Sequence, residues 1–281
     1  MKNSIVLSVQ PAKFQAATFK GDLEGNLQQI ASLGYEGVEL AIRDPHLLDY
    51  DALEKLVRSY GLAVPAIGTG QAWGEEGLSF TDPDPTVRYA AIERIKSHLP
   101  GARRFEAVII IGLIRGVIQP GVDPAQTMDW LIQALQECSQ AARPYGIRLA
   151  LEPINRYETP LINTAAEGLE LIKRVGADNF GLLLDTFHMN IEEADIEASI
   201  QQCEAHIFHF HVADSNRWYP GAGHLDFHSI LMTLKGTGYS GWVSGEFLPK
   251  PDAGTAAERN ILRMKQLYMP IEVSSSKKPP E

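Results

Sequence analysis

Four residues that each close a short apolar run are the best candidates for chemistry in this sequence. They are Glu152 (RLALE, 148–152), Asp185 (GLLLD, 181–185), His211 (IFHFH, 207–211) and Glu246 (WVSGE, 242–246). Their separations of 33, 26 and 35 residues are close to the length of one strand-plus-helix unit. If the runs are neighbouring parallel strands, three carboxylates and one imidazole meet at one end of a sheet. Burying three carboxylates together without a cation is costly, so the pattern predicts a divalent metal site.

Oxygen ligands and one imidazole favour Mn²⁺, Mg²⁺ or Co²⁺ in an octahedral shell over structural Zn²⁺. Four protein ligands leave two positions for substrate oxygens, so an α-hydroxycarbonyl group could bind through both. The ion would polarise the carbonyl and stabilise the enediolate that forms after proton removal. A carboxylate on each side of the reacting carbon would then serve as acid or base.

The histidine ligand has rivals in the run HIFHFHVAD. Strand alternation places His209 and His211 on one face and His206 on the other. His211 lies nearest the strand end and is the expected ligand, whereas His209 is expected to be packed or to lie behind the ligands.

Three charged or polar residues follow the same strands by three to six positions. Glu158 lies in EPINRYET, His188 in DTFHMN and Arg217 in HVADSNRW. A charged loop residue is usually solvated, but these three lie within reach of whatever the metal binds. Arg217 would neutralise charge on an enediolate oxygen, and His188 would donate a hydrogen bond to it.

Eight apolar runs alternate with eight helical stretches along the chain. The runs are 4–9, 37–42, 63–69, 107–113 and the four quoted above, and the helical stretches are 22–33, 48–60, 84–98, 124–144, 164–175, 195–204, 226–236 and 255–269. Runs without polar alternation are typical of parallel strands buried on both faces. The pattern predicts an α/β fold, a single (β/α)₈ TIM barrel. A doubly wound open sheet is the alternative, but SVQPAKFQA, after the first run, lacks its glycine-rich phosphate turn.

No linker divides the chain, so residues 1–271 are expected to form one catalytic barrel domain and 272–281 a disordered tail. Three connections, 69–85, 114–124 and 213–226, are longer than a barrel needs, and all follow strand ends on the catalytic face. Their aromatic residues are expected to cover or line a pocket: Trp73, Phe80, Trp218 and Tyr219.

The composition excludes several classes of protein. The net charge of −10, with no basic stripe, argues against a nucleic-acid partner. No run approaches the length of a membrane span, and the N-terminus has no secretory signal pattern. Only two cysteines are present, both in helical stretches, so no disulfide framework is expected. A cytoplasmic protein without a membrane partner is the expectation.

The segments EPINRYET, LLLDTFHMNIEE, HFHVADSNRWYPGAGHLDF and SGEF resemble the ketose 3-epimerases of the D-tagatose/D-psicose type, in the xylose isomerase-like TIM-barrel superfamily. The resemblance covers nearly the whole chain up to the tail. It implies a Mn²⁺-type ion on Glu152, Asp185, His211 and Glu246, with Glu152 and Glu246 as the acid/base pair. It also implies contacts from Glu158, His188 and Arg217 to substrate oxygens near C1 and C2, and assembly into dimers or tetramers. The third-strand loop AIGTGQAWGEEGLSF departs from the family, which bears on substrate identity rather than on the chemistry.

The resulting expectation is a metal-dependent isomerase that interconverts ketoses at C3 through a cis-enediolate. An aldose–ketose isomerase, similar to hydroxypyruvate isomerase, is the alternative, because it needs the same machinery displaced by one carbon. An abasic-site endonuclease shares the barrel but needs more histidines and a basic face. A non-catalytic sugar-binding barrel is disfavoured by the intact pair of glutamates.

Overall fold

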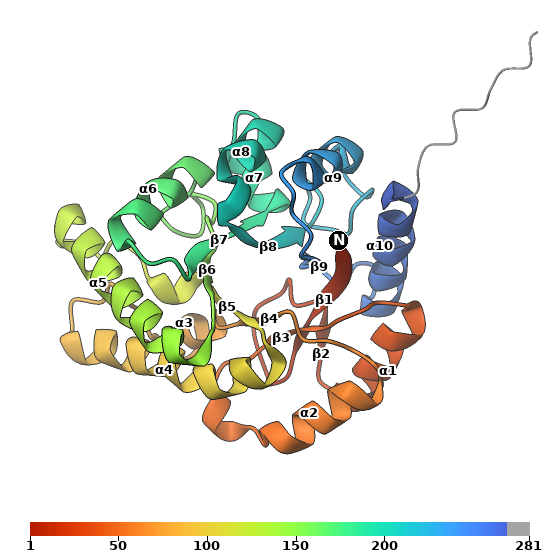
Figure 1. The fold of residues 1–281 in the computed structure, drawn as a ribbon, viewed down its shortest axis with the longest axis horizontal. Helices are drawn as coiled ribbons and strands as arrows, with labels where there is room; N and C mark the ends of the chain where they lie inside the picture. The colour runs from red at the N-terminus through yellow and green to blue at the C-terminus, as the bar shows by residue number, and fades with distance from the viewer. Residues whose placement is uncertain (269–281) are drawn as a thin grey trace, which may run out of the picture.

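The computed structural model describes residues 1–268 and shows a closed ring of eight parallel strands surrounded by helices (Figure 1). The ring strands are β1 (Lys2–Ser8), β3 (Glu39–Ala41), β4 (Ala66–Gly68), β5 (Val108–Ile111), β6 (Leu149–Leu151), β7 (Phe180–Asp185), β8 (Ile207–Val212) and β9 (Trp242–Gly245). β9 pairs with β1 and closes the ring, while the short β2 (Phe19–Lys20) pairs with β1 outside it. The predicted TIM barrel is confirmed, with all eight predicted runs as its strands. The predicted tail, 272–281, lies outside the described residues.

Helices follow the strands around the outside of the ring. They are α1 (Leu23–Leu33), α2 (Tyr50–Ser59), α3 (Gln71–Glu76), α4 (Pro85–Phe105), α5 (Pro124–Ala142), α6 (Ala165–Val175), α7 (Thr186–Glu192), α8 (Ile196–Cys203), α9 (Phe227–Gly236) and α10 (Ala253–Tyr268). The eight predicted helices are present, although α4 continues through Pro100 to Phe105 instead of ending at 98. The prediction missed α3 and α7, which have six and seven residues and lie in connections after strand ends.

Local signals explain where several helices begin. Asp123 accepts a hydrogen bond from the amide of Ala125 at 3.1 Å, with Pro124 as the first helical residue of α5. Thr164 and Glu167 form a reciprocal capping box at the start of α6. These caps fix the points at which the chain leaves the barrel mouth, and so they set the lengths of the loops that carry the site.

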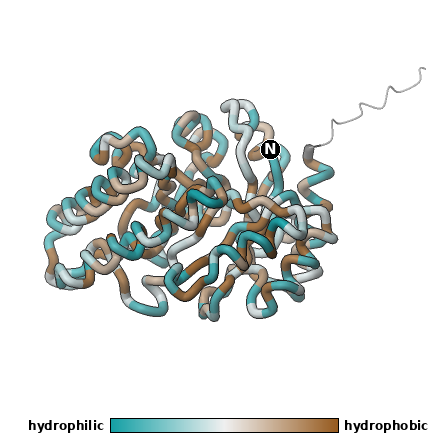
Figure 2. The backbone as a smooth tube through the Cα atoms, turned by 60° about the horizontal axis from the view of Figure 1, so that its bottom comes forward, coloured by the Kyte–Doolittle hydropathy of each residue, from teal (hydrophilic) through white to brown (hydrophobic). Residues whose placement is uncertain are grey.

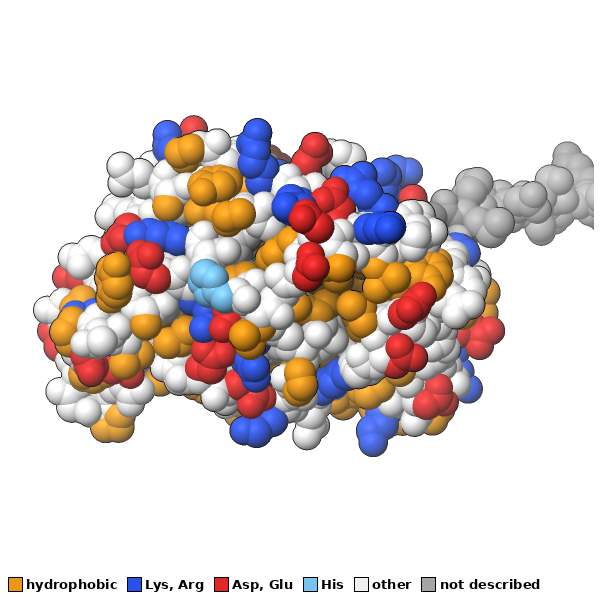
Figure 3. All heavy atoms as spheres, turned by 90° about the horizontal axis from the view of Figure 1, so that it is seen from below, with side chains coloured by type: hydrophobic (Ala, Val, Ile, Leu, Met, Phe, Trp, Pro, Cys, Tyr) orange, Lys and Arg blue, Asp and Glu red, His pale blue; other side chains and the backbone are white. Residues whose placement is uncertain are grey.

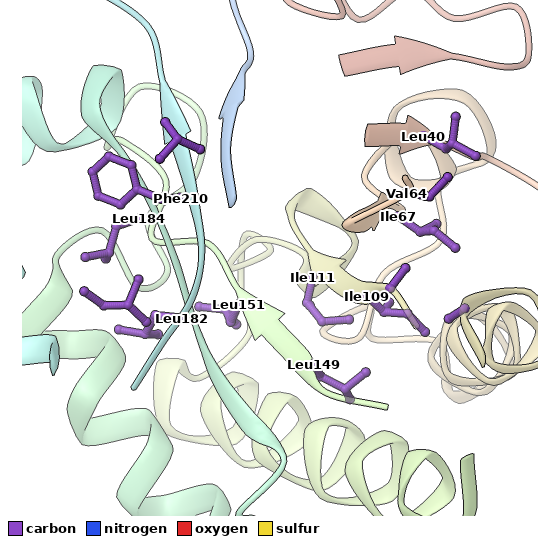
Figure 4. Close-up of a cluster of buried hydrophobic side chains, with 14 of the residues drawn as sticks. Leu40, Val64, Ile67, Ile109, Ile111, Leu149, Leu151, Leu182, Leu184 and Phe210 are labelled. Atoms are coloured by element: carbon purple, nitrogen blue, oxygen red, sulfur yellow. The ribbon is translucent and has the colours of Figure 1, made fainter. Parts of the chain in front are cut away.

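Alternation along each strand separates the hydrophobic core from the interior of the barrel. Leucine, isoleucine, valine and phenylalanine side chains point outward and pack between the strands and the helices (Figure 4). Leu149 and Leu151, for example, lie in this outer core, while Ala150 between them belongs to a small cluster inside the barrel. In the hydropathy tube, both hydrophobic and hydrophilic residues occur along the helical turns, as expected of helices with one buried face (Figure 2).

One irregularity in the barrel affects the site directly. Leu182 of β7 pairs with Ile207 of β8, but the next residue, Leu183, pairs with His209, so Phe208 is one extra residue in β8. Such an insertion changes the direction of the side chains that follow it. His209 and His211 therefore point into the barrel together, as predicted, whereas His206 lies in a 3₁₀ turn before the strand and is exposed.

The outer surface carries charges of both signs. On the face shown in Figure 3, Lys and Arg side chains are interspersed with Asp and Glu side chains. Both cysteines are buried and free. Among residues 1–268, no helix combines the length and apolar character needed to cross a bilayer.

Candidate metal centre

The structure brings the four strand-end residues together at the mouth of the barrel. Glu152 directly follows β6, Asp185 ends β7, His211 lies in β8 and Glu246 directly follows β9. One ligand atom from each residue lies within 4.8 Å of the corresponding atoms of the other three. Because these four strands are consecutive in the ring, their carboxyl ends place the four side chains at one point of the mouth.

His211 Nδ1 is the central atom of this cluster. It lies 3.8 Å from Asp185 Oδ2, 3.8 Å from Glu246 Oε2 and 4.0 Å from Glu152 Oε1. Three of these atoms, Glu152 Oε1, Asp185 Oδ2 and His211 Nδ1, are buried and have no hydrogen-bond partner. Buried polar atoms are nearly always satisfied, so converging unsatisfied ligand atoms fit a cation between them.

The separations also fit a single divalent ion. Oxygen and nitrogen ligands lie about 2.0–2.6 Å from Mg²⁺ or Ca²⁺, so ligands on one ion are at most about 5 Å apart. The donor set of three carboxylates and one imidazole suits Mg²⁺, Mn²⁺ or Co²⁺. The residues present therefore fit the metal that the sequence pattern predicts.

Burial and mutual repulsion perturb the protonation of the three carboxyl groups. Burial, followed by the negative charge of Glu246, raises the pKa of Glu152 well above its usual range. Burial likewise raises the pKa of Glu246 to about 7 and also raises the pKa of Asp185, although His211 opposes both shifts. Groups that resist ionisation in the absence of a counter-charge are expected where a cation completes the site.

Asp185 has a second contact that fixes its orientation. Its Oδ1 accepts a hydrogen bond from the amide of Phe187 at 2.7 Å and so caps the first turn of α7. This cap holds one oxygen of the carboxylate and leaves Oδ2 directed at the cluster. The seven-residue helix that the sequence did not predict therefore helps to orient a candidate metal ligand.

The three predicted substrate contacts also face the cluster. His188 Nε2 lies 3.6 Å from Glu152 Oε1, and Arg217 Nη2 lies 3.6 Å from Glu246 Oε2. Arg217 Nη1 donates a hydrogen bond to Glu158 Oε1 at 3.0 Å. These residues form a polar rim on one side of the four ligands, which is the placement that the sequence predicts.

Asn155, which the sequence reasoning missed, connects this rim. Its Nδ2 donates to Glu158 Oε1 at 2.9 Å and contacts His188 Nδ1 at 2.8 Å. The backbone amide of Asn155 also donates to His188 Nδ1, at 3.4 Å. His188 Nδ1 is therefore an acceptor, and the ring presents its Nε2–H to the cavity. Burial, reinforced by Arg217, lowers the pKa of His188 well below its usual value, so the ring is neutral at pH 7.

Arg217 is held in place by its backbone and by two aromatic rings. Its φ of 59° is in the left-handed region, its amide donates to Asp214 at 2.7 Å, and its carbonyl accepts from Leu248 at 2.8 Å. The guanidinium lies 4.8 Å from the ring centre of Phe187 and 5.5 Å from that of Phe14. A non-glycine residue with positive φ is strained. At Arg217, this strained backbone accompanies a guanidinium group that is held in one position beside the cluster.

Two other buried charged residues were missed by sequence reasoning. Arg115, fully buried in the turn after β5, donates from Nη1 to the backbone carbonyl of Glu152. Glu39 lies inside the barrel on β3, where it contacts His209 and His211. Arg115 is the only charged residue in LIRG, and Glu39 is the only one in GVELAI. Closure of the barrel, and not a local sequence pattern, therefore brings these two side chains to the site.

A cavity of about 300 Å³ opens above the cluster and is large enough for a small ligand. Its lining includes the polar residues Glu152, Glu158, His188, Arg217 and Glu246, and it also includes Phe14 and residues of α3. Of the four aromatic residues expected to cover or line the pocket, Trp73 lines it. Phe80 is instead fully buried in the core, because the loop folds inward there, and Trp218 and Tyr219 are outside the lining.

Comparisons with known proteins agree with the barrel fold. Residues 27–267 match the family model described as xylose isomerase-like TIM barrel. The chain is 32% identical to the L-ribulose 3-epimerase of Mesorhizobium japonicum over 83% of its own length and 78% of the relative. It is 30% identical to the D-psicose 3-epimerase of Agrobacterium fabrum, over 84% of the chain and 83% of the relative.

A solved structure has the same fold. The D-allulose 3-epimerase from Methylomonas sp. in complex with D-allulose superimposes with a TM-score of 0.80 at 26% identity, covering 95% of this chain and 97% of that one. The chain therefore belongs to the xylose isomerase-like TIM-barrel family, and ketose 3-epimerases are among its relatives there.

Proposed function

We propose that this protein is a divalent-metal-dependent isomerase that inverts C3 of a ketose. The observation that carries the proposal is the convergence of three unsatisfied, buried ligand atoms, on Glu152, Asp185 and His211, beside Glu246 at the floor of a ligand-sized cavity. The relatives named 3-epimerases support the reaction type. Glu152, Asp185, His211 and Glu246 would hold the ion, for which we propose Mn²⁺, with Mg²⁺ or Co²⁺ as alternatives. When bound, the ion would polarise the C2 carbonyl and lower the energy of the enediolate.

Glu152 and Glu246 are the proposed acid/base pair. They reach the cavity from β6 and β9, so they approach a bound sugar from different directions. One carboxylate takes the proton from C3, and the electrons of the C3–H bond form the C2=C3 double bond of a cis-enediolate with the charge on O2. The other residue, carrying a proton, delivers it to the opposite face of C3, and the C2 carbonyl forms again.

The polar rim would bind the oxygens near C1 and C2. His188 presents an Nε2–H donor, and Arg217 supplies a positive charge held by Glu158 and two aromatic rings. Donors fixed before the substrate arrives stabilise developing negative charge without reorganisation. Glu158, bound by both Asn155 and Arg217, would accept a hydrogen bond from a substrate hydroxyl with its second oxygen.

Isotope incorporation tests the proposal directly. The purified protein is incubated with Mn²⁺ in D₂O together with fructose, tagatose or ribulose, and each sugar is analysed by NMR. We expect deuterium at C3 together with the 3-epimer. Deuterium at C1 or C2 would instead indicate an aldose–ketose isomerase, and no incorporation into any ketose would reject the proposal.

A further inference from the structure

Glu39 is a buried carboxylate with no part in the reaction described so far. It is the first residue of β3, points into the barrel and is only 2% exposed. Its Oε2 contacts His209 Nε2 at 2.8 Å and His211 Nε2 at 2.9 Å, and its Oε1 contacts His211 Nε2 at 3.1 Å. Two histidines from β8 therefore meet one carboxylate from a strand on the other side of the barrel.

The contact with Glu39 determines how His211 presents its ring. A carboxylate can only accept hydrogen bonds, so His211 Nε2 carries the hydrogen and donates it to Glu39. The lone pair of the neutral ring is then on Nδ1. This is the nitrogen that has no hydrogen-bond partner and lies 3.8 Å from both Asp185 Oδ2 and Glu246 Oε2. Glu39 thus directs the ligand nitrogen of His211 towards the candidate metal centre.

His209 fixes Glu39 in turn. The two imidazole rings have centroids 5.3 Å apart and are nearly perpendicular, at 79°, so they approach Glu39 from different directions. His209 is 1% exposed and is absent from the lining of the cavity, to which Glu39 and His211 both contribute. It can therefore hold the carboxylate without contacting a substrate.

We propose that Glu39 is a positioning residue that sets the tautomer and orientation of His211 as a metal ligand, and that His209 holds Glu39 in place. This inference rests on the proposed function, because it requires the ion. Residues behind a histidine ligand typically change metal affinity by about 10- to 100-fold when they are replaced. Glu39→Gln, which keeps the shape but replaces one acceptor oxygen by a donor, is expected to weaken Mn²⁺ binding by about that factor.

The test compares Mn²⁺ binding by electron paramagnetic resonance in the wild type, Glu39→Gln and Ser244→Ala. Ser244 is the matched control, because it pairs with His211 in the neighbouring strand, is fully buried and has a hydroxyl without a partner. We expect one equivalent of Mn²⁺ in all three proteins, with affinity reduced only in Glu39→Gln. Equal affinity in Glu39→Gln and the wild type would overturn the role of Glu39 and leave the proposed function intact. A wild type that binds no Mn²⁺, Mg²⁺ or Co²⁺ would overturn both.

Two further results distinguish the positioning role from direct metal binding by Glu39 and from misfolding of the variant. A second equivalent of Mn²⁺ that disappears in Glu39→Gln would show that Glu39, His209 and His211 bind an ion themselves, and would overturn the positioning role. Imidazole ¹⁵N chemical shifts of the Mg²⁺-loaded wild type need no variant and so do not depend on how well Glu39→Gln folds. We expect His211 to be protonated at Nε2 and not at Nδ1, and the opposite tautomer would overturn the positioning role.

Discussion

Asp185 and His211 lie directly opposite each other on neighbouring strands, with Asp185 Oδ2 3.8 Å from His211 Nδ1. This pairing depends on the extra residue Phe208, which shifts β8 by one position relative to β7. Without the shift, the period-two alternation of the strand would direct His211 away from the barrel interior. The geometry of the candidate metal centre therefore depends on a local irregularity two to three residues before its histidine.

Gly181 makes room for that irregularity, so Gly181→Ala should destabilise the protein. A Cβ atom at this position would lie 2.7 Å from the carbonyl oxygen of His206 and 2.7 Å from Cδ2 of Phe208. Overpacking of this kind typically costs about 1–3 kcal/mol of unfolding free energy. Urea denaturation should show this loss, together with weaker Mn²⁺ binding. Gly236→Ala is the control, because nothing lies within 4 Å of an added Cβ there, and it should be close to neutral.

Replacing Glu246 by Gln should strongly reduce turnover while keeping the fold. The side chain is the proposed partner of Glu152 in proton transfer, and general acid–base groups contribute about 10²- to 10⁴-fold to rates. We expect C3 deuterium exchange to fall by about a thousandfold at saturating Mn²⁺, with an unchanged circular dichroism spectrum. Exchange within tenfold of the wild type would place the base on another residue.

The sequence revealed the strands and the four strand-end residues because each carries a local pattern. An acidic residue or histidine that ends an apolar run stands out in RLALE, GLLLD, IFHFH and WVSGE. Glu39 stands instead at the centre of GVELAI, where only closure of the barrel decides that its side chain points inward towards β8. The extra residue in β8 was equally hidden, because a one-residue shift leaves the composition of the run unchanged.

The helices, like the site residues, could be predicted only where the sequence carries a local pattern. Long amphipathic helices such as α5 and α6 carry caps and a hydrophobic period, and were predicted. α3 and α7 are too short for a period to develop, and their placement depends on contacts made by the folded loops. Because α3 lines the cavity and α7 is capped by Asp185, these missed elements belong to the site.

Asn155→Leu should reduce kcat/KM without changing metal affinity. The substitution keeps the number and branching of the side-chain heavy atoms but removes the side-chain donor that Asn155 gives to His188 and Glu158. Leaving a buried polar group without its partner costs about 1–3 kcal/mol, which corresponds to a loss of about 5- to 150-fold. Mn²⁺ affinity should stay within about twofold, because no ligand atom is touched.

Asn179→Leu is the matched control for that substitution. Asn179 also donates from its side chain to two partners, the carbonyls of Ser139 and Ile147, but it precedes β7 at the opposite end of the strand from the site. It should lower stability without changing kcat/KM. Equal losses of kcat/KM in both variants would show that Asn155 acts only through the fold.

Metal binding should release protons, and the affinity should rise with pH. Although burial lowers the pKa of His211, the negative charges of Glu39 and Glu246 raise it to about 10 in the metal-free protein. Burial raises the pKa of Glu246 to about 7. A metal ligand must be deprotonated, so at pH 7 the ion displaces a proton from His211, a fraction of one from Glu246 and any proton that burial retains on Glu152, whose pKa is also raised. The apparent affinity should therefore increase from pH 6 to pH 8 and level off only above the pKa of His211.

Calorimetry in two buffers of different ionisation enthalpy measures this release. We expect at least one proton per Mn²⁺ at pH 7, because the pKa values of all four proposed ligands are raised and that of His211 lies well above 7. In Glu246→Gln the fraction due to Glu246 disappears while the proton from His211 remains, so the number released should fall but not reach zero. Binding that releases no proton at pH 7 would contradict both assignments, since neither residue could then be protonated in the free site and deprotonated in the complex.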